Sequence, residues 1–389
     1  MQHVLFLVSW YPHRNAPALG NFIREHARAA AVNNTVSVVY AVSEEGIEEG
    51  ANELAEHHAG NLHEYIVYFG KTRSTLPVVA QLKKQNAYRT AIERGITQAE
   101  KANGIPSLLH VHVIWPAAIA AMPYLKHRKI PLLITEHWSG YLPEDGNYSG
   151  KVMKHFTKQL TDSARHITVV SGRMKKAMLS HGLKNEYSIL PNTVDTELFF
   201  PTHAQREGKQ LRLLHVSMLV DREKNISGIL RVMKKLEART EITLEIVGDG
   251  PEKEKHEANA KEAGLLNKNV FFPGYKNTHE VADTMRNSDL LLMFSHFEGM
   301  PVTIIEAQCC GLPVIASAVG AIPEMVPAEA GILVPPGDEA ALEKAILGYA
   351  DRKQFFSAAS IREKAVNRYS KAAVAKELDR LYASILSPK

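Results

Sequence analysis

The chain has few cysteines for its length. Cys309 and Cys310 are the only two among 389 residues, and they are adjacent. Neighbouring cysteines rarely form a disulfide, and the chain has no Cys/His pattern at zinc-binding spacing. The composition therefore excludes a disulfide framework and a zinc module. It favours a reducing compartment, and we expect a cytoplasmic protein.

Long apolar runs are also missing. The longest, such as residues 111–115 and 290–294, have the length of strands, well short of the roughly 18 residues of a membrane-spanning helix. The first residues enter a predicted strand at once and lack the basic region and cleavage site of a signal peptide. We therefore expect neither a membrane span nor a secretory leader.

The charge imbalance is small, with a net charge of +4 from 46 basic and 42 acidic residues. All of the excess lies in residues 1–200, and it is too weak to indicate nucleic-acid binding. It is compatible with an anionic acceptor or with peripheral contact on the inner face of a membrane. The basic amphipathic segment 151–166 leaves two interpretations open: a surface helix packed on a sheet, or a helix lying on anionic lipid.

A chain of this length predicts two domains. Both halves alternate short apolar runs with helical patterns, which predicts right-handed βαβ units and an α/β fold with doubly wound parallel sheets. A polar stretch from about 199 to 210 separates the halves. We expect one Rossmann-like domain over residues 1–200, a second over 201–370, and an amphipathic terminal helix within 371–389.

The most informative stretch is residues 296–307, which places Glu298 and Glu306 on either side of a strand-to-helix junction. Pro301 suits the first helical position, and we expect the helix to run to about Cys310. The unbonded N–H groups at the helix start attract an anion. Two carboxylates would repel phosphates, but they suit the hydroxyl groups on either side of a diphosphate. A nucleotide sugar has that layout.

This stretch resembles the Glu-x7-Glu signature of retaining glycosyltransferases of the GT-B fold, in particular glycosyltransferase family 4 (group 1). Residues 311–317 and 320–324 continue the resemblance. It implies two Rossmann-like domains facing a central cleft, an N-terminal one for the acceptor and a C-terminal one for the donor. A terminal helix would cross back to the first domain. The implied reaction moves a sugar from a nucleoside-diphosphate sugar to a glycan or glycolipid hydroxyl, in surface polysaccharide or glycolipid assembly.

The resemblance assigns the donor contacts. Glu298 would hold the hydroxyl groups of the sugar, and Glu306 would hold the ribose. The loop 217–225 resembles a segment whose arginine and lysine neutralise the diphosphate. Lys224 matches the lysine, but Met218 occupies the place of the arginine, and Arg222 is the nearby substitute. The start of the helix would contribute the remaining donor contacts, at Gly299, Met300, Pro301 and Val302.

Three residues at the ends of predicted strands are assigned to the other domain. By the resemblance, His112 reaches the reacting sugar and the leaving phosphate, while His137 and Trp138 line the acceptor side. His110 lies on the same strand face as His112, so a metal site is an alternative, but no third ligand has suitable spacing. Ordinary burial of His110 in the core is the default interpretation.

The loop after the first predicted strand contains Gly20, which the resemblance places where the backbone approaches the donor phosphates or the acceptor. Asn21 is expected to cap the following helix. The loop is not a GxGxxG fingerprint, so no nicotinamide or flavin site is predicted. The chain also has no Asp-x-Asp, so neither a metal ion nor a cofactor is expected.

Two other functions remain open. A sugar-nucleotide epimerase shares the two-domain fold and acts on the donor without an acceptor. A non-catalytic subunit would bind nucleotide sugars or glycans without transfer. The presence of Glu298, Glu306, Lys224 and His112 argues against that subunit, whereas Met218 argues mildly for it.

Overall fold

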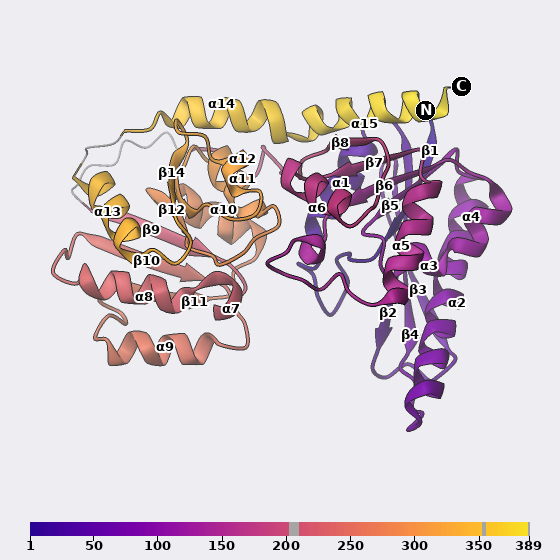
Figure 1. Cartoon of the computed structure of the whole chain (residues 1–389), viewed down its shortest axis with the longest axis horizontal. Coiled ribbons are helices and arrows are strands. Elements are labelled where there is room, and N and C mark those ends of the chain that lie inside the picture. Colours follow the sequence, from indigo (N-terminus) through magenta and orange to yellow (C-terminus); the bar gives the residue numbers. More distant parts are fainter. Residues whose placement is uncertain (202–209, 352–354, 388–389) are drawn as a thin grey trace. The chain divides into compact units, whose positions relative to one another are not determined.

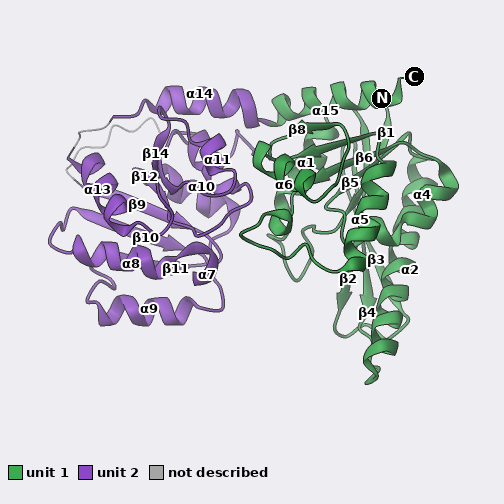
Figure 2. Cartoon of the chain, viewed as in Figure 1, with its two compact units in different colours: residues 1–193, 371–389 green, residues 194–370 purple. Residues whose placement is uncertain are grey.

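The computed structural model describes residues 1–201, 210–351 and 355–387. The chain forms two compact units, one of Met1–Thr193 with Lys371–Lys389 and the other of Val194–Ser370 (Figure 2). Each unit has its own sheet with helices on its faces (Figure 1). Most of the predicted linker, residues 202–209, lies outside the described residues.

The sheet of the first unit has eight strands in the order β3-β4-β2-β1-β5-β6-β7-β8. Only the β3–β4 pair is antiparallel. Both faces of the sheet are buried, because Leu5 and Leu7 of β1 join one core cluster while Val4 and Phe6 join another. The strands are β1 His3–Val8, β2 Thr35–Glu44, β3 Asn52–Ala59, β4 Leu62–Gly70, β5 Leu108–His112, β6 Leu132–Glu136, β7 His166–Val169 and β8 Tyr187–Ile189.

Helices cover both faces of this sheet. The last helix, α15, packs against α1, and its buried residues Val374, Leu378 and Tyr382 share a core cluster with Phe6 of β1. The C-terminal segment therefore belongs to the same unit as the N-terminus. The helices are α1 Asn21–Ala30, α2 Pro77–Asn103, α3 Ala117–Ala120, α4 Met122–Arg128, η1 Ser139–Tyr141, α5 Lys151–Ser163, α6 Gly172–Ser180 and α15 Lys371–Leu386.

The second unit has six parallel strands in the order β11-β10-β9-β12-β13-β14. The order of the chain reverses between β9 and β12, as it does between β1 and β5 in the first unit. In doubly wound sheets, ligands bind at the carboxyl ends of the strands beside such a reversal. The strands are β9 Leu211–Val216, β10 Ile242–Val247, β11 Val270–Gly274, β12 Leu290–Met293, β13 Val314–Ser317 and β14 Gly331–Val334.

Polar caps fix the starts of several helices in the second unit. Asn277 and Glu280 form a reciprocal capping box at α10, and Asp338 and Ser357 cap α13 and α14. These local signals explain why the segments begin as helices where they do. The helices are α7 Asp221–Lys224, α8 Ile226–Lys235, α9 Lys253–Glu262, α10 Thr278–Arg286, α11 Val302–Cys309, α12 Ile322–Met325, α13 Glu339–Ala350 and α14 Ala358–Tyr369.

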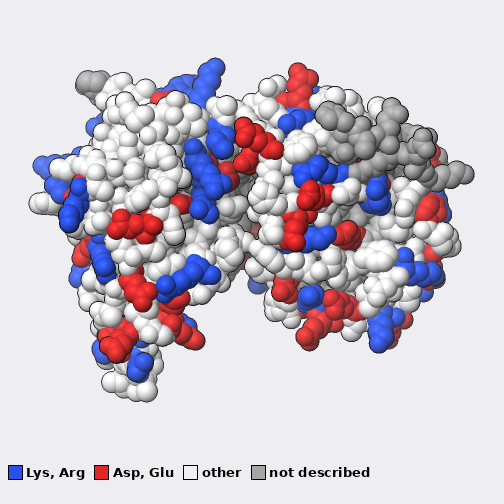
Figure 3. Space-filling view, turned by 180° about the vertical axis from the view of Figure 1, so that it is seen from behind, with Lys and Arg blue, Asp and Glu red and all other residues white. Residues whose placement is uncertain are grey.

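The structure confirms the α/β class with two doubly wound sheets, and it contains two strands that the sequence pattern did not predict, β3 and β4. The residues of β3 read as helix formers, and only pairing with β4 makes them a strand. Cys309 and Cys310 are both buried and free. Among the described residues, no helix is long and apolar enough to cross a bilayer. Basic and acidic residues are interspersed on the face shown in Figure 3.

Candidate functional site

In the second unit, the loops that follow β9 and β12 meet at the carboxyl ends of these paired strands. The backbone N–H of His296 donates to the carbonyl of Glu223 at 2.8 Å, which joins the β12 loop to α7. Beneath them, buried His215 donates from Nδ1 to the Leu292 carbonyl at 2.9 Å and accepts the Ser217 hydroxyl at Nε2 at 2.7 Å. Burial, followed by smaller effects that include nearby Lys224, lowers the pKa of His215 to about 4.

Glu298 and Lys224, both predicted donor residues, are in direct contact. The Lys224 ammonium donates to Glu298 Oε1 at 2.7 Å, and the Ser295 hydroxyl donates to the same oxygen at 2.7 Å. The side chains of Glu298 and Lys224 are only 7% and 16% exposed. A desolvated ion pair of this kind fixes the two groups relative to each other. The structure therefore brings a carboxylate and an ammonium together at the reversal point of the sheet.

Gly320 holds the backbone of the Glu298 loop. It adopts φ +54°, and a Cβ at this position would lie 1.8 Å from the Glu298 carbonyl oxygen. The next residue, Ala321, donates its N–H to the Gly299 carbonyl at 3.0 Å. Only glycine combines this backbone conformation with such a close approach. The segment 320–324 thus supports the loop that carries Glu298.

The helix α11 begins one residue later than predicted. Pro301 is its N-cap, in an extended conformation with φ −68° and ψ 116°, and Val302 is the first helical residue. The prediction of Pro301 at the first helical position was wrong, because ψ at Pro301 is not helical. The N–H of Ile304 donates to the Pro301 carbonyl at 3.2 Å, whereas the preceding N–H groups of Val302 and Thr303 have no carbonyl to bond inside the helix. Glu306 is half-buried one turn further along, and Met300 is buried.

The loop after β9 is held by two glycines. A Cβ on Gly248 would lie 1.9 Å from the Ser217 carbonyl oxygen, and one on Gly250 would lie 2.8 Å from the Leu219 backbone. On this loop the side chain of Met218 is 66% exposed. The guanidinium of Arg222 lies 5.8 Å from the centre of the Phe297 ring, on the loop that also carries Glu298. Met218 thus adds no charge here, whereas Arg222 does.

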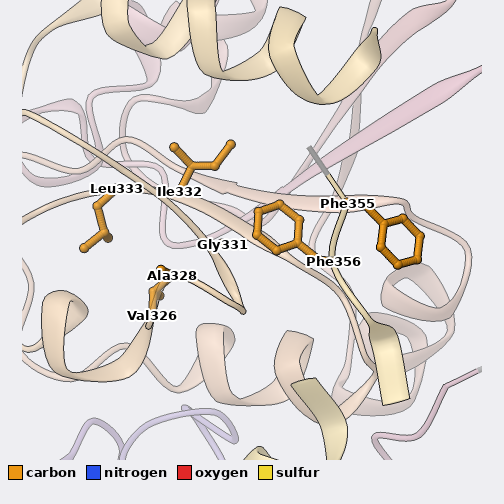
Figure 4. A pocket seen from close by; sticks show the side chains of 7 residues that line it. All are labelled: Val326, Ala328, Gly331, Ile332, Leu333, Phe355 and Phe356. Carbon is orange, nitrogen blue, oxygen red and sulfur yellow. The ribbon is translucent and has the colours of Figure 1, made fainter. Parts of the chain in front are cut away.

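A separate pocket of about 560 Å³ lies along the edge strand β14 of the second unit (Figure 4). Among the described residues that line it, none is charged and none is a predicted site residue. Its lining consists of Val326, Ala328, Gly331, Ile332, Leu333, Phe355 and Phe356. Within the described residues, no group of three or more His, Cys, Asp or Glu side chains could hold a metal ion.

In the first unit, Gly20 lies in the loop after β1. Its φ is +64°, and a Cβ there would lie 2.6 Å from the backbone of Trp10, so the loop folds back tightly on itself. Gly20 is the N-cap of α1 and Asn21 is the first helical residue. The predicted capping role of Asn21 was therefore wrong, because the glycine takes the left-handed conformation that places the helix start one residue earlier.

His112 and His137 are in contact, with His112 Nδ1 and His137 Nε2 3.1 Å apart and the rings stacked. His26 of α1 packs edge-on against both rings, with ring centres 5.4 and 5.2 Å away. His110 lies beneath His112, bonded to the hydroxyls of Tyr382 at 2.9 Å and Thr135 at 2.6 Å. His110 is thus a satisfied core histidine, as the default interpretation held. His112 Nε2 is buried with no hydrogen-bond partner in the described structure.

All four histidines of this cluster are neutral near pH 7. Burial, reinforced by the neighbouring imidazoles, lowers the pKa of His110, His112 and His137 well below the usual value. Burial also lowers the pKa of His26 to about 4. A proton on one ring would place a charge in a dry core beside three other rings. The pair His112–His137 can therefore offer neutral donors and acceptors, but no fixed positive charge.

The histidine cluster makes the stability of the first unit depend on pH. An unfolded histidine takes up a proton below pH 6.5, whereas His26 in the folded protein does so only near pH 4. The stabilisation that comes from neutral, buried His26 is therefore fully present above pH 6.5. It is lost as the pH falls from 6.5 toward 4, which lowers the free energy of unfolding by about 3 kcal/mol at most. We expect His26→Leu to flatten this dependence in denaturant unfolding measured between pH 7 and 4.5. The exposed His127→Leu is the control, and equal slopes for both variants would contradict this prediction.

Sequence reasoning missed His26, Glu136 and His215. None of the three belongs to a spacing pattern that marks it as functional in the sequence. Glu136 is fully buried and lies between Thr135 and His137. In this segment only His137 and Trp138 were predicted to have a role. Trp138, which was predicted, is half-buried, and its ring packs against Gly140 and Tyr141.

Two family models match this chain, one in each half. Residues 199–368 match the family model described as glycosyl transferases group 1, and residues 44–198 match the one described as glycosyltransferase family 4. TuaC of Bacillus subtilis, a glycosyltransferase ascribed to teichuronic acid biosynthesis, is 27% identical over 282 residues, or 70% of this chain and 68% of TuaC. A glycosyltransferase of Methanocaldococcus jannaschii is 28% identical over 241 residues. The chain spans 62% of that relative's length, less than two thirds.

Solved structures show the same fold. Sucrose-phosphate synthase from Thermosynechococcus elongatus superposes with a TM-score of 0.76 at 20% identity, over 99% of both chains. HepE of Anabaena, solved in complex with UDP, gives a TM-score of 0.73 at 16% identity, over 99% of this chain and 100% of HepE. At such identities the likeness shows the fold alone.

Proposed function

This chain belongs to the group 1, or family 4, glycosyltransferases, and on that premise we propose that it transfers a sugar from a nucleoside-diphosphate sugar to an acceptor hydroxyl. We further propose that the anomeric configuration is retained and that neither a metal ion nor a cofactor takes part. The observation that carries this proposal is the buried contact between Glu298 and Lys224, beside the start of α11. This contact supports a site in which the carboxylate serves the sugar and the ammonium serves the diphosphate.

Each residue of the second unit has a distinct role in this proposal. Lys224 and Arg222 neutralise the diphosphate, together with the free N–H groups at the start of α11. Glu298 accepts hydrogen bonds from the sugar hydroxyls, and Glu306 does so from the ribose. Gly299, Met300, Pro301 and Val302 form the backbone against which the donor rests. Because the Glu298 carboxylate is already fixed by Ser295 and Lys224, little ordering is needed when a sugar binds.

The reaction requires no nucleophile from the protein. The bond from the anomeric carbon to the diphosphate oxygen breaks, and the acceptor oxygen bonds to that carbon from the same face. The proton of the acceptor hydroxyl passes to the leaving phosphate. Negative charge grows on the diphosphate during this step, and Lys224 and the helix N–H groups stabilise it.

The first unit supplies the acceptor side in this proposal. His112 contacts the reacting sugar and the leaving phosphate, and His137 and Trp138 line the acceptor, while Gly20 allows the backbone to approach a ligand. The free acceptor or donor capacity of His112 Nε2 supports this role. Because His112 is fully buried, a substrate can reach Nε2 only if neighbouring side chains move.

The substrates proposed here follow from similarity and charge. HepE binds UDP in its solved structure, which supports a nucleotide donor. The link of TuaC to teichuronic acid supports an acceptor that is a surface glycan or glycolipid precursor. Thr157 and Leu160 of α5 are buried, which supports packing of α5 on the sheet, while Lys151, Lys154 and 66%-exposed Val152 face solvent. We propose that peripheral contact with the inner membrane face, if the acceptor is lipid-linked, uses this exposed side.

One observation favours a second function. At the place where the resemblance calls for an arginine, the 66%-exposed Met218 supplies no charge. A nucleotide-sugar-binding protein without transfer activity could tolerate this loss. In the transferase, Arg222 takes over the neutralising role.

Product analysis tests the proposal. We expect release of the nucleoside diphosphate that depends on an acceptor, with unchanged rate in EDTA, and NMR of the product should show the anomeric configuration of the donor. An isomerised donor formed without any acceptor would instead identify an epimerase. Binding without turnover across glycan and lipid-linked acceptors would favour the non-catalytic function.

A further inference from the structure

Glu136, the last residue of β6, carries a buried carboxylate that accepts four hydrogen bonds. Oε1 accepts the backbone N–H groups of His137 and Trp138, each at 3.0 Å. Oε2 accepts the backbone N–H of Ile114 and the hydroxyl of Tyr141, each at 3.2 Å. Glu136 is 0% exposed. Burial raises the pKa of Glu136, and the four hydrogen bonds oppose that shift because an ionised carboxylate accepts from every one of these donors.

The two oxygens connect different loops. The bonds to His137 and Trp138 lie within the segment that follows β6, whereas the bond to Ile114 crosses to the segment that follows β5. His112 is the last residue of β5, directly before the segment that follows this strand. His137 lies in the segment that follows β6. The same carboxylate therefore links the backbones that carry both histidines of the stacked pair.

The segment after β5 needs such a support. Val113, between His112 and Ile114, has φ +63°, which is unfavourable for a β-branched residue. It is held there on three sides. Its N–H donates to the Thr135 carbonyl at 3.1 Å, its carbonyl accepts the Ser9 hydroxyl at 2.7 Å, and the next N–H is bonded to Glu136.

We propose that Glu136 is a positioning residue that fixes His112 and His137 relative to each other by tying together the loops after β5 and β6. In the described structure its carboxylate forms no hydrogen bond with either imidazole. It acts through the backbone N–H groups of the two loops, and the Tyr141 hydroxyl is a further donor. The proposed consequence for catalysis rests on the proposed function, whereas the consequence for the histidine pair does not. Loss of the link lets Val113 relax from its strained conformation, and this displaces His112.

The variant Glu136→Asp separates this role from simple burial of a charge. Aspartate keeps the charge and can still bond the N–H groups of residues 137 and 138, as aspartates do in local turns. It is one methylene shorter, so it cannot also bridge to the N–H of Ile114. The matched control is Glu64→Gln. Glu64 is likewise a buried glutamate of this sheet, bonded to Tyr11 and Arg24, but it contacts neither histidine loop.

Histidine side-chain 15N spectra at pH 7 provide the first readout. The wild-type pair should show one fixed tautomer at each ring, assigned with His112→Asn and His137→Asn. We expect Glu136→Asp to give averaged tautomers for both rings and Glu64→Gln to leave these signals in place. Fixed wild-type signals in Glu136→Asp would overturn the proposal, whether or not the protein transfers a sugar.

The rate of transfer provides the second readout. Displacement of a reacting group by about 1 Å costs roughly 100-fold. We expect kcat of Glu136→Asp to fall by that order and the donor KM to change less, because most of the proposed donor contacts belong to the second unit. Should Glu136→Asp not fold, Tyr141→Phe removes one donor from Oε2 and should still perturb the His112 signals. Unchanged signals in folded Tyr141→Phe would then overturn the proposal.

Discussion

Replacing Glu298 by glutamine should lower kcat/KM for transfer by about 10²–10³-fold, the usual loss when one transition-state contact is removed. Glutamine has the shape of glutamate, but it has one acceptor oxygen in place of two and no charge. The single oxygen must then serve Lys224, Ser295 and the sugar together. Because Lys224 is only 16% exposed, its ammonium would also lose the counter-charge beside the diphosphate site.

The same change should reduce stability without unfolding the protein. Breaking a buried ion pair costs about 3 kcal/mol, and Glu298→Ala should approach that value while glutamine stays below it. A typical domain has 5–15 kcal/mol of stability, so both variants should remain folded. Steady-state rates and denaturant unfolding measure the two effects, with the exposed Glu329→Gln as the control. A Glu298→Gln enzyme with the wild-type rate would remove Glu298 from the site.

Gly320→Ala should be almost as damaging, although it removes no functional group. The added methyl would lie 1.8 Å from the Glu298 carbonyl oxygen, and φ +54° is itself unfavourable for alanine. The loop must therefore shift, and Glu298 moves with it. We expect a loss of roughly 100-fold in kcat/KM, the cost of misplacing a contact by about 1 Å.

Gly337→Ala is the matched control for this prediction. Gly337 also belongs to the second unit and has φ +73°, but a Cβ there would meet nothing within 4 Å. This variant should carry only the conformational penalty of about 1 kcal/mol and keep the wild-type rate. Comparing the two variants in the transfer assay and in thermal unfolding isolates the steric effect. Equal rates in both would show that the loop tolerates displacement.

The parts of the site that depend on local sequence were predictable. A strand, a turn and a proline-led helix within residues 290–309 fix where Glu298 and Glu306 lie relative to the helix start, to within the one-residue error at Pro301. The fold class followed in the same way from alternating elements. The order of strands is a tertiary property, yet it is this order that places β9 beside β12 and so brings Lys224 to Glu298.

The parts that depend on single buried polar residues were not predictable. Glu136 acts through backbone N–H groups, which every residue but proline has, so its partner Ile114 shows no signal in the sequence. His26 joins the histidine cluster only because α1 packs on the sheet beside β5. The strand β3 was missed because its glutamates, alanines and histidines do not favour strands, and pairing with β4 outweighs that preference.

Binding of nucleotide sugars to the purified protein tests the central claim most directly. Thermal unfolding with UDP-, GDP- and ADP-sugars, without metal, should show one nucleotide class that stabilises the wild type, by about 2.7 kcal/mol at a hundredfold excess over Kd. Lys224→Ala should weaken this effect, and the exposed Lys364→Ala should not. If no nucleotide sugar stabilised the wild type at any concentration, the second unit would not be a donor site.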